Sequence, residues 1–376
     1  MIASVLFAAG IGVAQLAPTA LTVEYRTDPV GLDAAHPRLS WHMAAEPDAK
    51  NERQTAYRVL VASSAANLAA NRGDLWDSGR VAGDQSLNVE YAGRPVGSSQ
   101  RVFWKVKTWN AAGVESDWSA AAKWTQGIVD GWKAKWIGFP RNPQPAFVKT
   151  FAVKKGLVSA TLHITGLGYY VAWANGTRVG DKVLDPSPTS YDRRVLYSTY
   201  EIESLLKEGE NKLDVILGRG WYDVPVDKTW NFDEAPWRDR PRMIAQLELS
   251  YADGSHETVV SDESWKTRAN PVAYDSLREA EVVGEVGPAP VVGAAAQVVS
   301  APKGKLCAEM QPGSKVMRTL RPVSVKKVAE GWMVSFAENI AGWVRLTARG
   351  LKKGAVVSVR YDERIEPDGS PAKVRM

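Results

Sequence analysis

Short runs of alternating residues, each ended by a turn, recur along nearly all of this chain of 376 residues. The clearest run is 101–109, where Val102, Trp104 and Val106 share one face of a strand and Arg101, Phe103, Lys105 and Lys107 share the other. Gly, Pro, Asn and Asp separate such runs, which is typical of β-sandwiches and not of a helical or parallel α/β fold. We therefore predict an all-β fold of tandem β-sandwiches.

The first two predicted sandwiches occupy residues 21–126 and 127–287. In the first, a strand, a polar turn and a Trp-Ser pair before the last strand resemble a fibronectin type III domain. In the second, the pair Asn175–Gly176 predicts a hairpin, since both central residues of a type I′ turn need positive φ. The number and spacing of its strands indicate a jelly-roll-like sandwich.

Residues 287–304 are rich in Ala, Val, Pro and Gly, and we interpret them as a linker. Residues 300–376 then predict a third sandwich, with strands at 332–336, 342–349 and 355–361. About seventy residues is small for a free-standing sandwich without disulfides. We expect this third sandwich to be incomplete and the chain to be truncated.

The first 20 residues resemble a signal peptide. Residues 2–14 are small and apolar, and Gly12–Val13–Ala14 fits a cleavage site, although no basic residues precede them. This run is too short to span a bilayer, and no other stretch predicts a membrane span. We expect a secreted or periplasmic protein; the alternative is a buried N-terminal segment.

Composition excludes several classes of function. The net charge is only +5, and no block of five or six basic residues suits a phosphate backbone, so we expect no nucleic-acid partner. Cys307 is the only cysteine, which excludes an intrachain disulfide. The four histidines do not pair at a metal-ligand spacing. No Gly-x-Ser-x-Gly motif is present, but the four scattered histidines leave a Ser-His-Asp arrangement open.

Several segments resemble the N-terminal region of bacterial α-L-rhamnosidases, and they occur in the family's order. They are VEYRTDPVGLD at 23–33, PRLSW at 37–41, NGTRVG at 175–180, LYSTY at 196–200, LGRGWY at 217–222 and FAENIAGWVRL at 336–346.

The resemblance implies hydrolysis of terminal α-L-rhamnosyl groups with inversion, which needs an acid and a base carboxyl group. In the family these groups lie on an (α/α)₆ barrel downstream of the segments seen here, so no catalytic residue can be assigned. We expect the chain to be the N-terminal portion of a secreted α-L-rhamnosidase, inactive alone, whose partners are rhamnose-containing glycans. The alternative is a complete, non-catalytic carbohydrate-binding protein. The oligomeric state stays open.

Sugar recognition combines aromatic rings with carboxylates that accept hydroxyl hydrogen bonds. These residue types concentrate in a predicted loop after the strand at 211–217. The predicted carbohydrate-binding residues there are Trp221, Tyr222, Trp230, Asp233, Glu234 and Trp237. The alternative is that the tryptophans plug the end of the sandwich. The carboxylates Glu279 and Glu281 are interpreted as solvated surface.

A second cluster of aspartates follows the Asn175–Gly176 hairpin. We include Asp185 and Asp192 among the predicted carbohydrate-binding residues, because some rhamnosidase modules resemble calcium-dependent rhamnose binders. Clustered aspartate oxygens would suit calcium, although the spacing is not that of an EF-hand. The alternative is that these aspartates stabilise turns. No cofactor is expected to be required, and the identity of any metal stays open.

Overall fold

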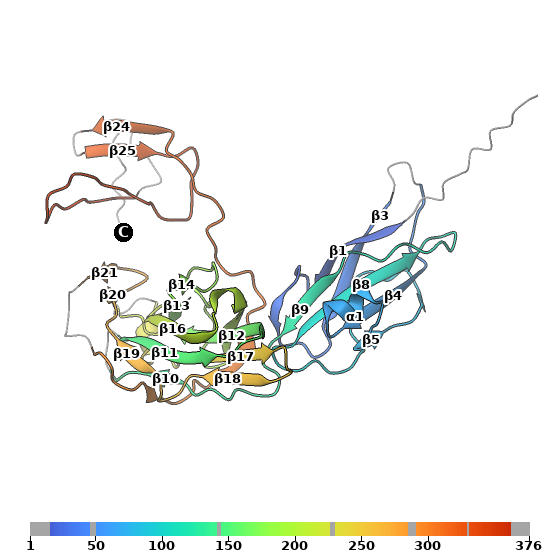
Figure 1. Ribbon diagram of the computed structural model, residues 1–376. Helices are drawn as coiled ribbons and strands as arrows, with labels where there is room; N and C mark the ends of the chain where they lie inside the picture. Colours follow the sequence, from blue (N-terminus) through green and yellow to red (C-terminus); the bar gives the residue numbers. More distant parts are fainter. Residues whose placement is uncertain are drawn as a thin grey trace, which may run out of the picture. The chain divides into compact units, whose positions relative to one another are not determined.

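The computed structural model describes residues 16–45, 50–140, 144–225, 230–284, 291–328 and 331–361. The signal-like run at 2–14 lies outside these residues. Within them the chain is almost entirely β, which confirms the predicted class of tandem β-sandwiches (Figure 1). No helix in the described ranges has the length and apolar character needed to cross a membrane.

The first sandwich pairs a sheet of three strands with a sheet of six. The small sheet has the order β1 (Ala17–Val23), β3 (Arg38–Ala44) and β7 (Val89–Glu90). The large sheet has the order β2 (Val30–Leu32), β9 (Ala122–Gln126), β8 (Arg101–Trp109), β4 (Ala56–Ala62) and β5 (Trp76–Asp77), with β6 (Val81–Ala82) also on β4. A short helix, α1 (Ala65–Ala69), follows β4.

Tryptophans fill the core of this first sandwich. The residues predicted to share one face of β8, namely Val102, Trp104 and Val106, are fully buried, and Trp41 and Trp124 pack in the same cluster. The alternation in the sequence therefore reports the inward face correctly, because successive side chains of a strand point to opposite sides of the sheet.

The second sandwich faces a sheet of seven strands with a sheet of five. The larger has the order β22 (Gln297–Val298), β10 (Ile137–Gly138), β17 (Arg242–Tyr251), β12 (Leu157–Leu167), β15 (Arg194–Glu201) and β23 (Lys305–Ala308), with β18 (His256–Val260) on β17. The smaller has the order β14 (Thr177–Arg178), β13 (Tyr169–Ala174), β16 (Gly209–Gly218), β11 (Ala146–Val153) and β19 (Lys266–Arg268).

The second sandwich extends beyond the predicted end at 287. β22 pairs with β10, and β23 pairs in parallel with β15. The segment interpreted as a linker, 287–304, therefore includes one strand of this sheet, and a second strand follows it. Such short edge strands carry too few residues to show alternation, so the sequence pattern misses them.

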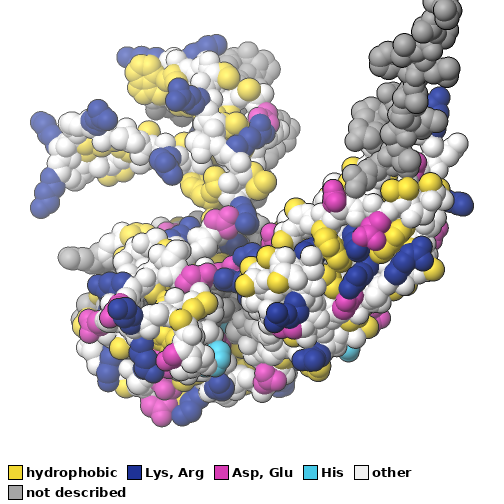
Figure 2. Space-filling model, turned by 45° about the vertical axis from the view of Figure 1, so that its right-hand side comes forward, with side chains coloured by type: hydrophobic (Ala, Val, Ile, Leu, Met, Phe, Trp, Pro, Cys, Tyr) yellow, Lys and Arg dark blue, Asp and Glu magenta, His cyan; other side chains and the backbone are white. Residues whose placement is uncertain are grey.

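Three smaller elements lie outside the two sheets of the second sandwich. The hairpin of β20 (Val272–Asp275) and β21 (Glu281–Val283) stands apart from both large sheets. Two 3₁₀ turns, η1 (Glu203–Leu205) and η2 (Phe232–Glu234), lie in loops. On the sandwiches as seen in Figure 2, Lys and Arg side chains are interspersed with Asp and Glu.

A second compact unit comprises Asp181–Val183 and the chain from Ser314 onward. Its described strands are β24 (Ser324–Val328) and β25 (Gly331–Ser335), which pair with one another. The strands predicted at 342–349 and 355–361 are not formed in the described residues. Alternation alone does not make a strand, because each strand needs a neighbour for its backbone hydrogen bonds.

Candidate functional site

The loop between β16 and β17 carries an exposed cluster of aromatic rings. The rings of Trp221 and Trp230 are stacked, with centroids 5.9 Å apart and an interplanar angle of 23°. The ring of Phe232 lies 5.0 Å from that of Trp221. Trp230 is 67% exposed, although tryptophan side chains in folded proteins are mostly buried. We call Trp221, Trp230 and Phe232 the aromatic shelf.

Two other predicted residues, Tyr222 and Trp237, lie beneath this shelf. Tyr222 is buried, and its ring contacts that of Tyr191 at 5.4 Å. The ring of Trp237 lies 6.0 Å from Tyr191 and 6.3 Å from Phe232. Burial raises the pKa of Tyr222 to about 12, so its hydroxyl stays protonated. Some of the predicted rings therefore pack against the sandwich and others face solvent, and their role in sugar binding stays a prediction.

The β20–β21 hairpin meets the shelf from a distant part of the sequence. The backbone N–H of Arg219 donates to Asp275 Oδ2 at 2.6 Å, and its guanidinium lies 5.7 Å from the ring of Tyr274. At the tip of the hairpin, the guanidinium of Arg278 lies 4.7 Å from the ring of Trp230. Sequence reasoning missed Arg278, because no local signal links it to a loop some fifty residues earlier.

The carboxylates near the shelf differ in exposure and pairing. Asp223 is buried between the guanidinium groups of Arg219 at 3.8 Å and Arg238 at 3.6 Å. Burial raises the pKa of Asp275, despite its hydrogen bond from Arg219. Asp233 is half-buried and Glu234 is exposed, so of the predicted acidic residues here Glu234 is the one open to solvent.

Asp185 lies in a separate, buried polar network. It is 4% exposed and accepts hydrogen bonds from the hydroxyls of Tyr170, Tyr200 at 2.7 Å and Ser198 at 2.9 Å. These hydrogen bonds join Asp185 to strands β13 and β15, so its side chain faces inward and not a turn or solvent. It is therefore not part of the aromatic shelf.

Asp192 is half-buried, and its Oδ1 has no hydrogen-bond partner in the described residues. Within the described ranges, no group of three or more His, Cys, Asp or Glu side chains is arranged to hold a metal ion. The calcium site stays a prediction.

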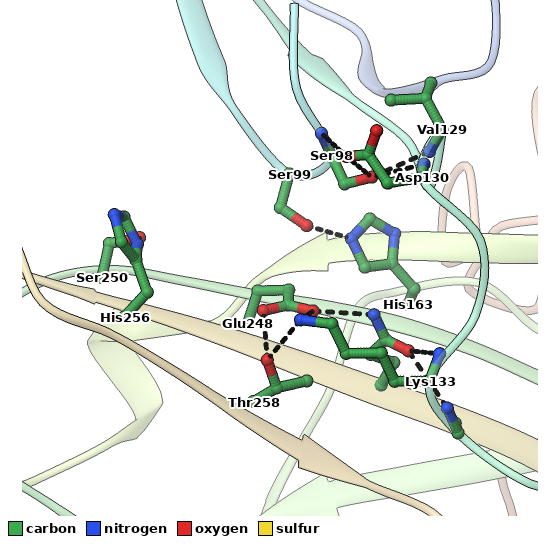
Figure 3. A network of polar contacts seen from close by, with 12 residues as sticks. Ser98, Ser99, Val129, Asp130, Lys133, His163, Glu248, Ser250, His256 and Thr258 are labelled. Atoms are coloured by element: carbon green, nitrogen blue, oxygen red, sulfur yellow. Dashed lines mark hydrogen bonds and ion pairs between the residues drawn. The ribbon is translucent and has the colours of Figure 1, made fainter.

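His163 forms a close pair with a serine from the first sandwich (Figure 3). Its Nε2 lies 2.7 Å from Ser99 Oγ, and its Nδ1 lies 3.0 Å from Thr199 Oγ1. A nucleophilic serine needs a histidine that can accept a proton and a third group to orient it. Here the third group is a neutral hydroxyl, and burial lowers the pKa of His163 to about 3. This arrangement joins two sandwiches and has the wrong chemistry for a catalytic triad.

The fold and the shelf together define a class: a protein of tandem β-sandwiches that presents aromatic rings on one loop. Two family models match the chain. The N-terminal immunoglobulin domain of Rha78A-like proteins matches residues 18–130, and the α-L-rhamnosidase N-terminal domain matches residues 155–318. The second match continues past 287, in agreement with the positions of β22 and β23.

Similar full-length proteins are named α-L-rhamnosidases. One from Formosa agariphila is 32% identical over 92% of this chain and 40% of its own length. One from Alteromonas sp. is 28% identical over 93% of this chain and 40% of its own length. The chain therefore spans about 40% of the length of each of these two relatives.

Solved α-L-rhamnosidase structures share the fold. The Dictyoglumus thermophilum enzyme has a TM-score of 0.71 and 33% identity, covering 82% of this chain and 37% of that enzyme. The Streptomyces avermitilis enzyme, solved with L-rhamnose, has a TM-score of 0.72 at 23% identity, covering 83% and 48%. Over most of its length, the chain is thus similar to the N-terminal domains of α-L-rhamnosidases.

Proposed function

We propose that this chain serves as the N-terminal portion of an α-L-rhamnosidase that releases terminal α-L-rhamnosyl groups by inversion. The observation that carries this proposal is the ordered match of both N-terminal domains to α-L-rhamnosidases, the two cited relatives being about 2.5 times as long as this chain. In this proposal, the acid and base carboxyl groups lie in the part of the relatives that this chain does not span.

The test is hydrolysis of 4-nitrophenyl α-L-rhamnopyranoside. We expect no release of nitrophenol by residues 1–376, and release by the same residues fused to the remaining portion of the Formosa agariphila relative. Hydrolysis by residues 1–376 alone would show that the chain carries its own catalytic groups. An inactive but folded fusion would count against the proposed role.

Within that role, we propose that the aromatic shelf binds rhamnose-containing glycans. The supporting observation is the 67% exposure of Trp230, whose ring stacks on Trp221 and also lies 4.7 Å from the guanidinium of Arg278. The apolar faces of sugar rings pack well on such surfaces, while nearby polar groups bind the hydroxyls. This binding role would hold equally if the chain acted without catalysis, which was the alternative from the sequence.

Calorimetric titration with rhamnose-containing oligosaccharides tests this binding. We expect Trp230→Ala to weaken binding about tenfold, since burial of an aromatic side chain contributes about 1.5–3 kcal/mol. Tyr25→Ala is the matched control, because Tyr25 is equally exposed, at 66%, but lies outside the shelf. Equal affinities for the two variants would remove the shelf as the binding site.

Secretion and calcium dependence belong to the same proposal. The apolar run at 2–14 supports export, which mass spectrometry of the mature N-terminus would test. The aspartates that follow the Asn175–Gly176 hairpin in the sequence motivate the calcium proposal, which titration with calcium in chelator-treated buffer would test. Retention of Met1 or absence of calcium binding would contradict the respective part.

A further inference from the structure

The two sandwiches meet through polar side chains, while their apolar cores stay separate. In the part of the chain that the structure describes, no cluster of buried apolar side chains includes residues of both sandwiches. Hydrogen bonds and ion pairs cross the interface, among them Ser99 with His163 at 2.7 Å and Lys123 with Glu201 at 2.9 Å. Such an interface can open without unfolding either sandwich, because each keeps its own core.

His163 is the group of this interface that responds first to acid. Its ring is fully buried, and both ring nitrogens are bonded to hydroxyl groups, Nε2 to Ser99 and Nδ1 to Thr199. Burial lowers the pKa of His163 to about 3, so the closed interface holds the ring neutral. Once separated from Ser99 and reached by water, the ring returns toward a pKa of about 6.5 and binds a proton.

The groups packed against the ring are neutral in the closed form. From β15, the ring of Tyr197 lies 5.9 Å from that of His163, and burial raises the pKa of Tyr197 well above its usual value. Trp132, in the segment that joins the sandwiches, lies 6.3 Å away. On β17, Gln246 is paired with His163 in the strand register.

The carboxylates that bond to these neighbours are engaged by other groups. Glu248 accepts from Gln246 at 2.7 Å and lies 4.0 Å from Lys133 (Figure 3). Asp130 accepts from the hydroxyl of Ser98 at 3.0 Å, and Asp33 accepts from the hydroxyl of Tyr197. A proton on His163 would therefore find hydroxyl groups and no carboxylate as its partners in the closed interface.

Two backbone features show how closely the sandwiches fit. Gly31 of the first sandwich approaches β15 so closely that a Cβ there would clash with the side chain of Thr199. Ser99 has a φ of 61°, a conformation that costs energy for serine and has to be held by its surroundings. Opening the interface therefore breaks the bond between Ser99 and His163 and relieves this strain.

We propose that the interface between the two sandwiches is an acid-sensitive latch, which opens when a proton binds His163 and leaves each sandwich folded. The open form binds one proton more at this residue, so acid favours it. The opening equilibrium should rise about tenfold for each pH unit below about 6.5. Burial opposes the charge of Glu201, but hydrogen bonds from Lys123 and Thr125 leave its pKa lowered, so Glu201 acts in the same direction at lower pH.

Hydrogen–deuterium exchange of the full chain at pH 7.5, 6.0 and 5.0, corrected for the intrinsic effect of pH on exchange, tests the latch. The reporters are two backbone N–H groups that donate across the interface, Ile128 to the hydroxyl of Tyr197 and Ala308 to Asp33. We expect their protection to fall about thirtyfold between pH 6.5 and 5.0, whereas peptides from β4 and β16 stay protected. An equal loss in these core peptides would overturn the latch.

Three variants separate the latch from general acid sensitivity. His163→Gln should make the protection of both reporters independent of pH between 7.5 and 5.0, and the matched control His256→Gln, at an exposed histidine, should keep the dependence of the parent chain. Gly31→Ala should open the interface already at pH 7.5, with the core peptides still protected. A dependence on pH retained in His163→Gln, or loss of core protection in Gly31→Ala, would overturn the proposal.

Discussion

His163 is a neutral histidine held between the two sandwiches, and this gives the fold a specific dependence on pH. Its ring is fully buried among Ser99, Thr199, Trp132 and Tyr197. Burial lowers its pKa to about 3, whereas an unfolded histidine has a pKa of about 6.5. Between these values the unfolded chain binds a proton that the folded chain does not.

We therefore expect His163 to contribute stability at neutral pH that is lost as the pH falls from about 6.5 toward 3. One such group changes the free energy of unfolding by about 1.4 kcal/mol per pH unit in this range. Denaturant unfolding of His163→Gln between pH 7.5 and 4.5 should show a shallower loss of stability than the parent chain. His256→Gln is the control, because His256 is exposed. Parallel curves for parent and His163→Gln would contradict this prediction.

Glu201 ties the two sandwiches together through several donors of the first. Its carboxylate accepts from Arg101 at 2.8 Å, Lys123 at 2.9 Å and the hydroxyl of Thr125 at 2.8 Å. Burial opposes the charged form, but the hydrogen bonds from Lys123 and Thr125 and the charge of Arg101 outweigh it and leave the pKa of Glu201 lowered. This contribution to stability is present above the ordinary glutamate pKa and is lost as the pH falls through the lowered value.

Glu201→Gln should lower the free energy of unfolding by about 2 kcal/mol, because charged hydrogen bonds would be replaced by weaker ones. The measurement is urea unfolding at pH 7. Glu203→Gln is the matched control, since Glu203 bonds to one donor of the first sandwich, Arg101 Nη2 at 2.9 Å. A smaller loss for Glu201→Gln than for Glu203→Gln would contradict the central role of Glu201.

The site residues show where sequence reasoning reaches its limit. Trp230 and Glu234 are exposed as a binding loop requires, because polar and aromatic residues without alternation do indicate a loop. Tyr222 and Asp185 are buried, and burial depends on contacts that a single sequence does not contain. Arg278 joins the shelf only through tertiary structure, so no pattern could have predicted it.

At the scale of elements, the Asn175–Gly176 turn follows directly from the sequence. Both residues have positive φ, 50° and 82°, as the predicted hairpin requires. A Cβ at Gly176 would meet nothing within 4 Å, so a substitution there acts through the backbone and not through a clash. β13 and β14 pair on either side of this turn.

Gly176→Val should therefore destabilise the chain by about 1–2 kcal/mol, since a β-branched residue is strained at positive φ. Gly176→Asn should cost less, because asparagine adopts this conformation more readily. Thermal unfolding of both variants checks the order. Equal midpoints would show that the strain is relieved by a local rearrangement of the exposed turn.

Long strands were predictable and short ones were not. β8 begins and ends where its alternation predicts, because nine residues give several repeats of the pattern. β22 has two residues and was interpreted as linker, since two residues show no period. In the second unit, alternation at 342–349 predicted a strand that is not formed, which shows that pairing as well as pattern is required.

At the scale of the whole molecule, the two units differ in how well they cover apolar side chains. The sandwiches bury their large hydrophobic residues in continuous cores. In the second unit, Val325, Val334 and Trp332 share one face of the β24–β25 hairpin by their register, and all three are exposed. Trp343 is also 62% exposed. Contiguous exposed apolar surface on a soluble protein usually marks a contact surface.

We therefore expect residues 1–376 to bind an apolar fluorescent dye and to self-associate at high concentration. Replacing Trp332 and Trp343 together by serine should reduce both the dye fluorescence and the association seen by sedimentation, because both are large aromatic side chains exposed to solvent. Trp230→Ser is the matched control, since Trp230 is similarly exposed but lies on the aromatic shelf. Loss of dye fluorescence and association in Trp230→Ser, but not in the double variant, would contradict this prediction. The aromatic shelf would then be the apolar contact surface.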